Sequence, residues 1–284
     1  MRTTTLGELG NNLPIGILQG ENKNVLQKAF ELRPFKTRVD RHLGKWKLAN
    51  ASKYDEGQMT SSLVAKLLSL LLINVGDSAF PLDPEGDSPP ESEVKLYNWH
   101  ADDVMVAYLR ARINALGPEM QLAMSCANPN CDYHTDAAIF DLNTTEVRVA
   151  ENIEDLFSWV DLHEPFVCRD GKTVIKRVKL GPVMWSSLCQ PGVLLNAAMG
   201  GFDSRSMQDS IHAINGGEPY KMTPGEIDEI GKRDFLRLEQ QAQEHSAGAA
   251  MQTTVICPKC GFPNVNALQW SYDDFFGLSS LSET

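Results

Sequence analysis

Two short cysteine pairs constrain this chain more than any other feature of its sequence. Cys257 and Cys260 lie in CPKCG, and Cys126 and Cys131 lie in SCANPNC about 125 residues upstream. A tight turn that carries two cysteines presents two sulfurs to one side of a metal ion, and two such turns complete the tetrahedral site of structural Zn²⁺. We therefore expect a single four-cysteine zinc site that closes this long loop.

The two pairs differ in how strongly they indicate a metal. Gly261 follows the downstream pair directly, and a glycine there permits the positive φ that turns backbone amides toward sulfur. The upstream turn has four residues between its cysteines, and His134 lies close enough in sequence to replace one of them. The alternative to one shared site is two unrelated pairs of reduced thiols.

The chemistry expected of such a site is structural. Four thiolates leave no open coordination position for a reactive water. A redox Cys-x-x-Cys usually opens a helix at the end of a strand, whereas Gly261 and Pro263 disfavour a helix here. We therefore expect the zinc to hold the chain together.

Nothing else in the sequence predicts an enzyme. The chain has no GxxxxGK[ST], HExxH or GxSxG motif. Asp102 and Asp103 beside His100, and His163 with Glu164, are the combinations of histidine and carboxylate that look catalytic. The positive end of a helix explains the two aspartates, and the second pair precedes a strand.

The periodicity of apolar residues predicts an α+β fold: helical segments around a small antiparallel sheet with a zinc-ribbon-like site. Helical spacing predicts one long buried helix at 58–75. It predicts a second helix that is capped by Asn98 and stops at Gly117. Alternation with a period of two predicts strands between 119 and 180 that form one antiparallel sheet, with a tight turn at Asp170-Gly171.

The same reading divides the chain into regions. Residues 77–93 are rich in Pro, Asp, Glu and Ser and are expected to form an exposed loop. We expect an N-terminal arm at 1–30, a helical region at 31–118, and a sheet and zinc-ribbon region at 119–284 with a helical insertion at about 181–250. Within that insertion, Thr223 and Glu226 predict a capping box.

Composition restricts the partners. The formal net charge of -11 disfavours binding to a phosphate backbone, so we expect no nucleic acid partner. The apolar run 61–75 contains Lys66 and falls short of the roughly 20 apolar residues of a membrane span, so we expect no membrane partner either. The aromatic residues Trp270, Phe275 and Phe276 predict either a C-terminal anchor packed on the body or a docking surface for another protein.

The order of several motifs resembles a known family. ELRPF, the helix DVMVAYLRARINALGPE, the two cysteine turns and the ending NALQWSYDDFF together look like the tail-assembly and baseplate proteins of contractile-tailed bacteriophages, the group related to the baseplate hub assembly proteins of T-even phages. The resemblance covers about residues 31 to 277, and the four cysteines match the metal-binding pairs. The long stretch between the pairs and the two extra residues in the first turn depart from a compact ribbon.

This resemblance implies a non-enzymatic structural component of the tail baseplate. Such a protein would occur in several copies around the tail tube, contact other tail and baseplate proteins, and reside in the virion after assembly in the host cytoplasm. One alternative is an assembly chaperone that is absent from the mature virion. An alternative of another class is a zinc-ribbon regulator that binds nucleic acid.

Overall fold

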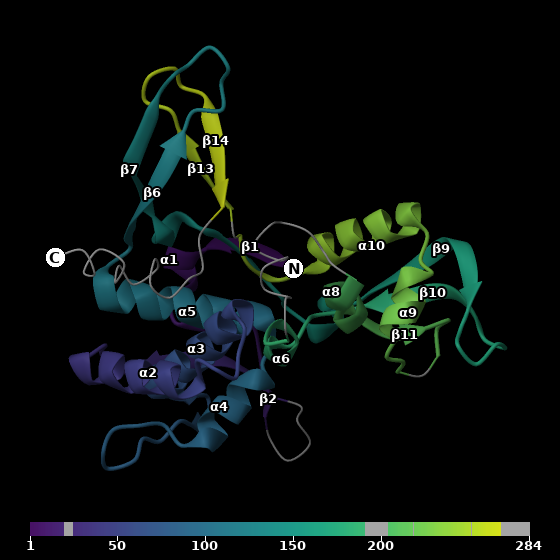
Figure 1. Cartoon of the computed structure of the whole chain (residues 1–284), viewed down its shortest axis with the longest axis horizontal. Coiled ribbons are helices and arrows are strands. Elements are labelled where there is room, and N and C mark those ends of the chain that lie inside the picture. Colours follow the sequence, from purple (N-terminus) through teal and green to yellow (C-terminus); the bar gives the residue numbers. More distant parts are fainter. Residues whose placement is uncertain (20–24, 191–203, 218, 251, 268–284) are drawn as a thin grey trace.

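The computed structural model describes residues 1–19, 25–190, 204–217, 219–250 and 252–267. Helices and small antiparallel sheets are both present, which confirms the α+β class. The described elements form three parts (Figure 1). A smaller lobe, formed by residues 158–180 and 204–245, lies beside a large body. The hairpins at 119–141 and 252–267 form an arm that projects from the body and is called the hairpin arm, or simply the arm, below. Within the described ranges, no helix combines the length and apolarity needed to cross a bilayer.

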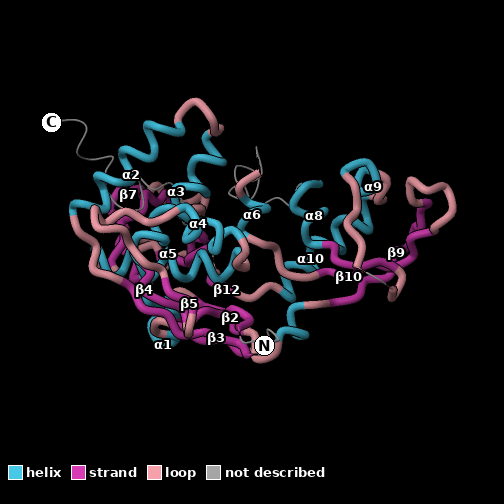
Figure 2. The backbone as a smooth tube through the Cα atoms, turned by 90° about the horizontal axis from the view of Figure 1, so that it is seen from below, coloured by secondary structure: helices cyan, strands magenta, loops and turns pink. Residues whose placement is uncertain are grey.

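The body holds the largest apolar core, formed by helices that pack on a four-stranded sheet. Figure 2 shows the strands of this sheet side by side along one side of the helices. The sheet order is β2-β3-β4-β5. The elements are β2 (Asn12–Gln19), β3 (Val25–Leu32), β4 (Leu72–Val75), β5 (Ser78–Ala79), α2 (Thr37–Asn50), α3 (Glu56–Leu71), α4 (Pro90–Tyr97) and α5 (Ala101–Leu116).

The first residues of the chain differ from the expected arm at 1–30. They form β1 (Arg2–Thr5), the short helix α1 (Leu6–Leu9), β2 and part of β3. Leu6, Leu13 and Ile15 are fully buried. Leu6 lies on α1, and Leu13 and Ile15 lie on β2 beside the buried Pro14 and Gly16, so this segment packs into the core instead of extending from it.

The expected long helix at 58–75 is wrong at its C-terminal end. α3 ends at Leu71, and the chain continues directly into β4. Every residue from 61 to 72 is buried, so the periodicity cannot show where a buried helix gives way to a buried strand.

The segment 77–93 is not the exposed loop that its composition predicts. Phe80 is fully buried, and Lys66 on α3 lies 2.8 Å from a carboxylate oxygen of Asp87 and 3.1 Å from one of Glu93. The Lys66 ammonium also donates to the Ser88 hydroxyl at 2.9 Å. A buried ammonium needs such partners, and they hold this segment against α3.

The start of α5 also differs from the prediction. Asn98 ends α4, and His100 is the N-terminal cap of α5, without a side-chain capping hydrogen bond. The end of the helix is confirmed, because α5 stops at Leu116 and Gly117 has a φ of 85°.

The lobe has a core of its own beneath a three-stranded sheet of order β11-β10-β9. The predicted turn is confirmed, since Gly171 has a φ of 68° and the Asp170 carboxylate accepts from the amides of Lys172 and Thr173. The elements are β9 (Ser158–Val167), β10 (Val174–Leu180), β11 (Ile211–Ile214), α8 (Ser204–Ser210), α9 (Pro224–Asp228) and α10 (Lys232–His245). The capping box predicted at Thr223 and Glu226 opens α9.

The prediction that the strands between 119 and 180 form one sheet is wrong. β6 (Glu119–Ser125) and β7 (His134–Asp141) pair only with each other, whereas β8 (Glu146–Val149) lies between β1 and β12 (Gly248–Ala249). A strand can pair with strands that are distant in the sequence, so local alternation does not reveal which strands pair. The structure also has short 3₁₀ helices at Leu142–Thr144 and Ile153–Leu156 and the helix α6 (Trp185–Leu188).

Candidate metal centre

The arm consists of two antiparallel hairpins, and each carries a cysteine pair at its turn. One hairpin is formed by β6 and β7, and the other by β13 (Gln252–Ile256) and β14 (Pro263–Ala267). The two hairpins stand side by side and project from the body (Figure 1). Segments more than a hundred residues apart in sequence therefore bring their turns to one place.

Backbone hydrogen bonds shape the downstream turn. The amide of Cys257 donates to the carbonyl of Phe262 at 2.9 Å, and the amide of Gly261 donates to the carbonyl of Cys257 at 2.8 Å. Gly261 has a φ of 73°, in the left-handed region that favours glycine. The positive φ expected at this position is confirmed.

The longer upstream turn is organised by its own polar residues. The amide of Cys126 donates to the carbonyl of Tyr133 at 2.9 Å, and the amide of Cys131 donates to the carbonyl of Asn128 at 3.0 Å. The side-chain oxygen of Asn128 accepts from the amide of Asn130 at 3.0 Å. These bonds close the four-residue spacing into a compact turn that presents both sulfurs to the same side.

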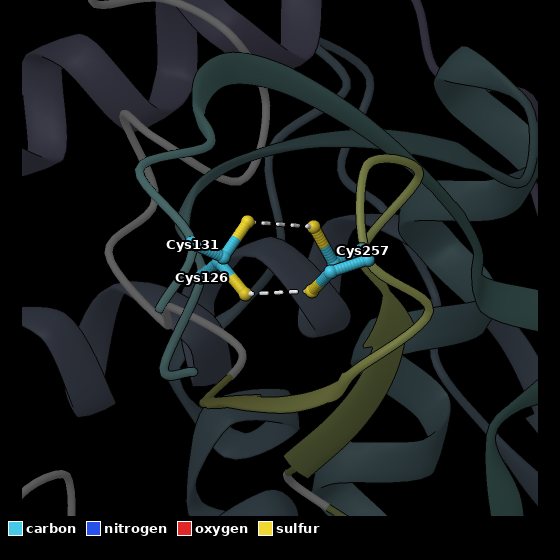
Figure 3. A group of neighbouring side chains, drawn as sticks. Cys126, Cys131 and Cys257 are labelled. Carbon is cyan, nitrogen blue, oxygen red and sulfur yellow. Dashed lines mark hydrogen bonds between the residues drawn. The ribbon is translucent and has the colours of Figure 1, made fainter. Parts of the chain in front are cut away.

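The four sulfurs meet between the two turns, and Figure 3 shows them pointing toward one another. The Sγ atoms of Cys126 and Cys260 lie 3.6 Å apart, and those of Cys131 and Cys257 lie 3.9 Å apart. All four lie within 4.8 Å of one another. Tetrahedral Zn–S bonds of about 2.3 Å place sulfurs about 3.8 Å apart, so the cluster matches the size of a four-thiolate zinc site.

These separations also exclude disulfides within the cluster. A disulfide brings two sulfurs to about 2.05 Å, far closer than any pair here. Cys168 is buried in the lobe, and Cys189 lies at the end of α6, so both lie apart from the cluster. All six cysteines lie in the described part of the chain, and all six are free thiols.

The four thiols differ in their environment. Cys257 is buried and Cys260 is exposed, while the other two are partly buried. Without a metal, the backbone N–H of Phe262 lowers the pKa of Cys260, whereas withdrawal from water raises the pKa of Cys126. The thiolate is the metal-binding form, so binding of a metal by the four cysteines would release protons.

One residue of this centre was missed by the sequence analysis. Asn264 is only 3% exposed; its side-chain oxygen accepts from the amide of Ala127 at 2.6 Å, and its side-chain nitrogen donates to the carbonyl of Phe262 at 3.0 Å. It therefore joins the two hairpins beside the sulfurs. An exposed ion pair between Lys259 and Asp132 links the same two turns.

His134 does not belong to the group of four cysteines. Its Nδ1 lies 2.9 Å from the hydroxyl of Ser125, and its Nε2 lies 3.0 Å from a carboxylate oxygen of Asp136. The imidazole is largely exposed. The four cysteines can therefore hold a metal without it.

Among the residues considered above as catalytic, the side chain of Asp103 and the backbone amides of His163 and Glu164 make structural contacts. Asp103 is fully buried and accepts from the amides of Ile15 and Gly16 at 2.9 and 3.0 Å. The amides of His163 and Glu164 both donate to Asp234 at 3.0 Å, which fixes the start of α10 on β9.

The aromatic residues Trp270, Phe275 and Phe276 lie outside the described residues. Comparisons of the chain with models of protein families, with curated proteins and with solved structures found no match.

Proposed function

We propose that this chain is a non-enzymatic structural component of a contractile phage tail baseplate, with a structural Zn²⁺ bound by Cys126, Cys131, Cys257 and Cys260. The observation that carries the zinc assignment is the group of four sulfurs, all within 4.8 Å of one another, from two separate hairpins. A set of four sulfur ligands is typical of structural zinc or iron–sulfur sites, and the zinc-ribbon spacing favours zinc.

The architecture of the arm supports a stabilising role for the metal. Each hairpin has only two strands, and an isolated two-stranded hairpin is marginally stable in water. The ion would cross-link the turns of both hairpins. Four thiolates would fill its coordination sphere, which leaves no position for a reacting water.

The assignment to a baseplate rests on the sequence resemblance, and the surface of the arm supports contact with other subunits. Ile139, Ile256 and Val265 are 64%, 58% and 65% exposed on the two hairpins. Apolar side chains that are exposed on a projecting element are available for contact with another protein. Other tail proteins are the partners we propose.

Quantitative mass spectrometry of purified virions tests this function. A structural subunit should be present in intact particles in a fixed ratio to the other baseplate proteins. Presence in infected cells with absence from particles would favour the assembly chaperone instead. Affinity for DNA or RNA that falls steeply with salt would favour the regulator.

A further inference from the structure

A pocket of about 710 Å³ lies on the body, where β2 meets the junction of α4 with α5. A volume of this size is within the range of about 300 to 1,000 Å³ that is typical of sites for small molecules. No described residue of the arm lines the pocket, so it is separate from the candidate metal centre. The apolar part of its lining consists of Ile17, Leu18, Trp99, Ile153 and Met184.

Backbone contacts hold the walls of this pocket in place. His100 forms an antiparallel bridge with Met184, which joins the start of α5 to the segment before α6. The amide of Gly16 donates to the carboxylate of Asp103 at 3.0 Å, which joins β2 to the first turn of α5. These contacts fix the shape of the pocket before any molecule binds in it.

Lys95 on α4 places a positive charge in the lining of the pocket. Its ammonium donates to the carbonyl of Ala79 at 2.7 Å and lies 5.2 Å from the centre of the Phe80 ring. It forms no ion pair with any residue that the structure describes. An ammonium has three N–H donors, so the contact with Ala79 leaves two of them for another acceptor.

Two further polar side chains of the lining have no hydrogen-bond partner among the described residues. Trp99 is only 5% exposed, and its indole N–H donates to none of them. Nδ1 of His100 is buried and also has no partner there. Burial lowers the pKa of His100 to about 4, so its imidazole is neutral at pH 7. Such polar groups are uncommon inside folded proteins and need an explanation, such as a functional role or a bound water or ion.

We propose that this pocket binds a small carboxylate that has an apolar, aromatic body. The unused groups of Lys95 and Trp99 are hydrogen-bond donors, so the group that complements them is an acceptor, and a carboxylate also matches the charge of Lys95. An aromatic ring suits the remaining lining, because it can pack against the indole of Trp99 and the thioether of Met184. Asp77 also lines the pocket and would oppose the carboxylate, which gives the test a second sign.

Titration with 1-naphthylacetate and with its neutral counterpart 1-naphthylacetamide tests the proposal. In ¹H–¹⁵N NMR spectra of the full chain with labelled tryptophan, the acid should shift the indole signal of Trp99, which Trp99→Phe identifies. The indole of Trp185 is the internal control, because this residue is 1% exposed and donates to the carbonyl of Ser61 at 3.2 Å. The acid should bind about tenfold more tightly than the amide, because a charge-assisted hydrogen bond is stronger than a neutral one.

Three variants examine the charges. Lys95→Met keeps an apolar chain of similar length and should abolish the preference for the acid over the amide. Asp77→Asn should increase the affinity for the acid several-fold, because it removes a like charge from the lining. Lys45→Met, which changes an exposed lysine on α2 outside the pocket, should bind both compounds as the wild type does.

The proposal would be overturned if the Trp99 signal did not move at about 1 mM acid. Equal affinity of the wild type for the acid and the amide would also overturn it, because binding would then depend on apolar contact alone. Weaker binding of the acid to Asp77→Asn, or an unchanged preference in Lys95→Met, would contradict the assigned charges. The comparison of the two compounds on the wild type is decisive even where a variant fails to fold.

Discussion

The sulfurs of Cys131 and Cys257 lie 3.9 Å apart although the residues are 126 positions apart in the chain. This contact joins the turns of two hairpins that otherwise belong to different sheets. A metal ion at this position would convert two marginal hairpins into one arm, because it closes a long loop that the unfolded chain would leave open. Removing one ligand should therefore affect the arm more than the body.

Substitution of Cys257 by serine should lower bound zinc from about one ion per chain to well below half an ion. Exchange of arm amides should accelerate, while amides in α3 and α5 keep their protection. Inductively coupled plasma mass spectrometry and hydrogen exchange measure the two effects. Cys189→Ser is the matched control, because this thiol lies outside the cluster, and full zinc retention in Cys257→Ser would disprove the assigned ligand set.

Replacement of Asn264 by alanine should destabilise the arm by about 1 to 3 kcal/mol, because it removes the buried side chain that accepts from the amide of Ala127 and donates to the carbonyl of Phe262. Zinc should leave this variant faster when a chelator is added. Thr254→Ala, on the exposed side of β13, serves as the control. Equal release rates for the two variants would show that Asn264 does not hold the hairpins together.

The aspartates at the start of α5 predict how stability depends on pH. Burial raises the pKa of Asp102 and of Asp103 to about 7, and an unfolded aspartate titrates near 3.9. Between these values the native state holds protons that the unfolded state releases, so this contribution to stability is lost as pH rises. The free energy of unfolding of Asp102→Asn minus that of the wild type should therefore increase from pH 4 to pH 7. A constant difference in urea unfolding across this range would refute the assignment.

Substitution of Lys66 by methionine should destabilise the body by about 2 to 3 kcal/mol, since Glu93 and Asp87 lose their buried cation. The cost is below that of a fully buried pair because Asp87 reaches solvent. The exposed Lys45→Met on α2 should change stability by less than about 0.5 kcal/mol. Urea unfolding of both variants measures the difference, and equal midpoints would argue against a structural role for the Lys66 network.

The meeting of the cysteine pairs could be predicted from sequence because ligand type and spacing carry the geometry of the ion they bind. The turn at Asp170-Gly171 and the capping box at Thr223 were predictable for a similar reason, since each depends on a few adjacent residues. Asn264 was not, because its role depends on the register of β13 with β14 and on a partner in another hairpin.

The errors at the level of architecture share one physical cause: each depends on contacts with residues that are distant in the sequence. Leu72 continues an apolar run in which helix and strand have the same signature. The strand at 146–149 alternates as expected, yet its partners come from both ends of the described chain. Lys66 attracts a polar segment into contact with the core, which composition alone does not reveal.

X-ray absorption at the zinc edge of the purified protein tests the central claim most directly. The account predicts about one zinc per chain, surrounded by four sulfur atoms at about 2.3 Å. Absence of bound zinc, or a shell in which nitrogen or oxygen replaces sulfur, would contradict it.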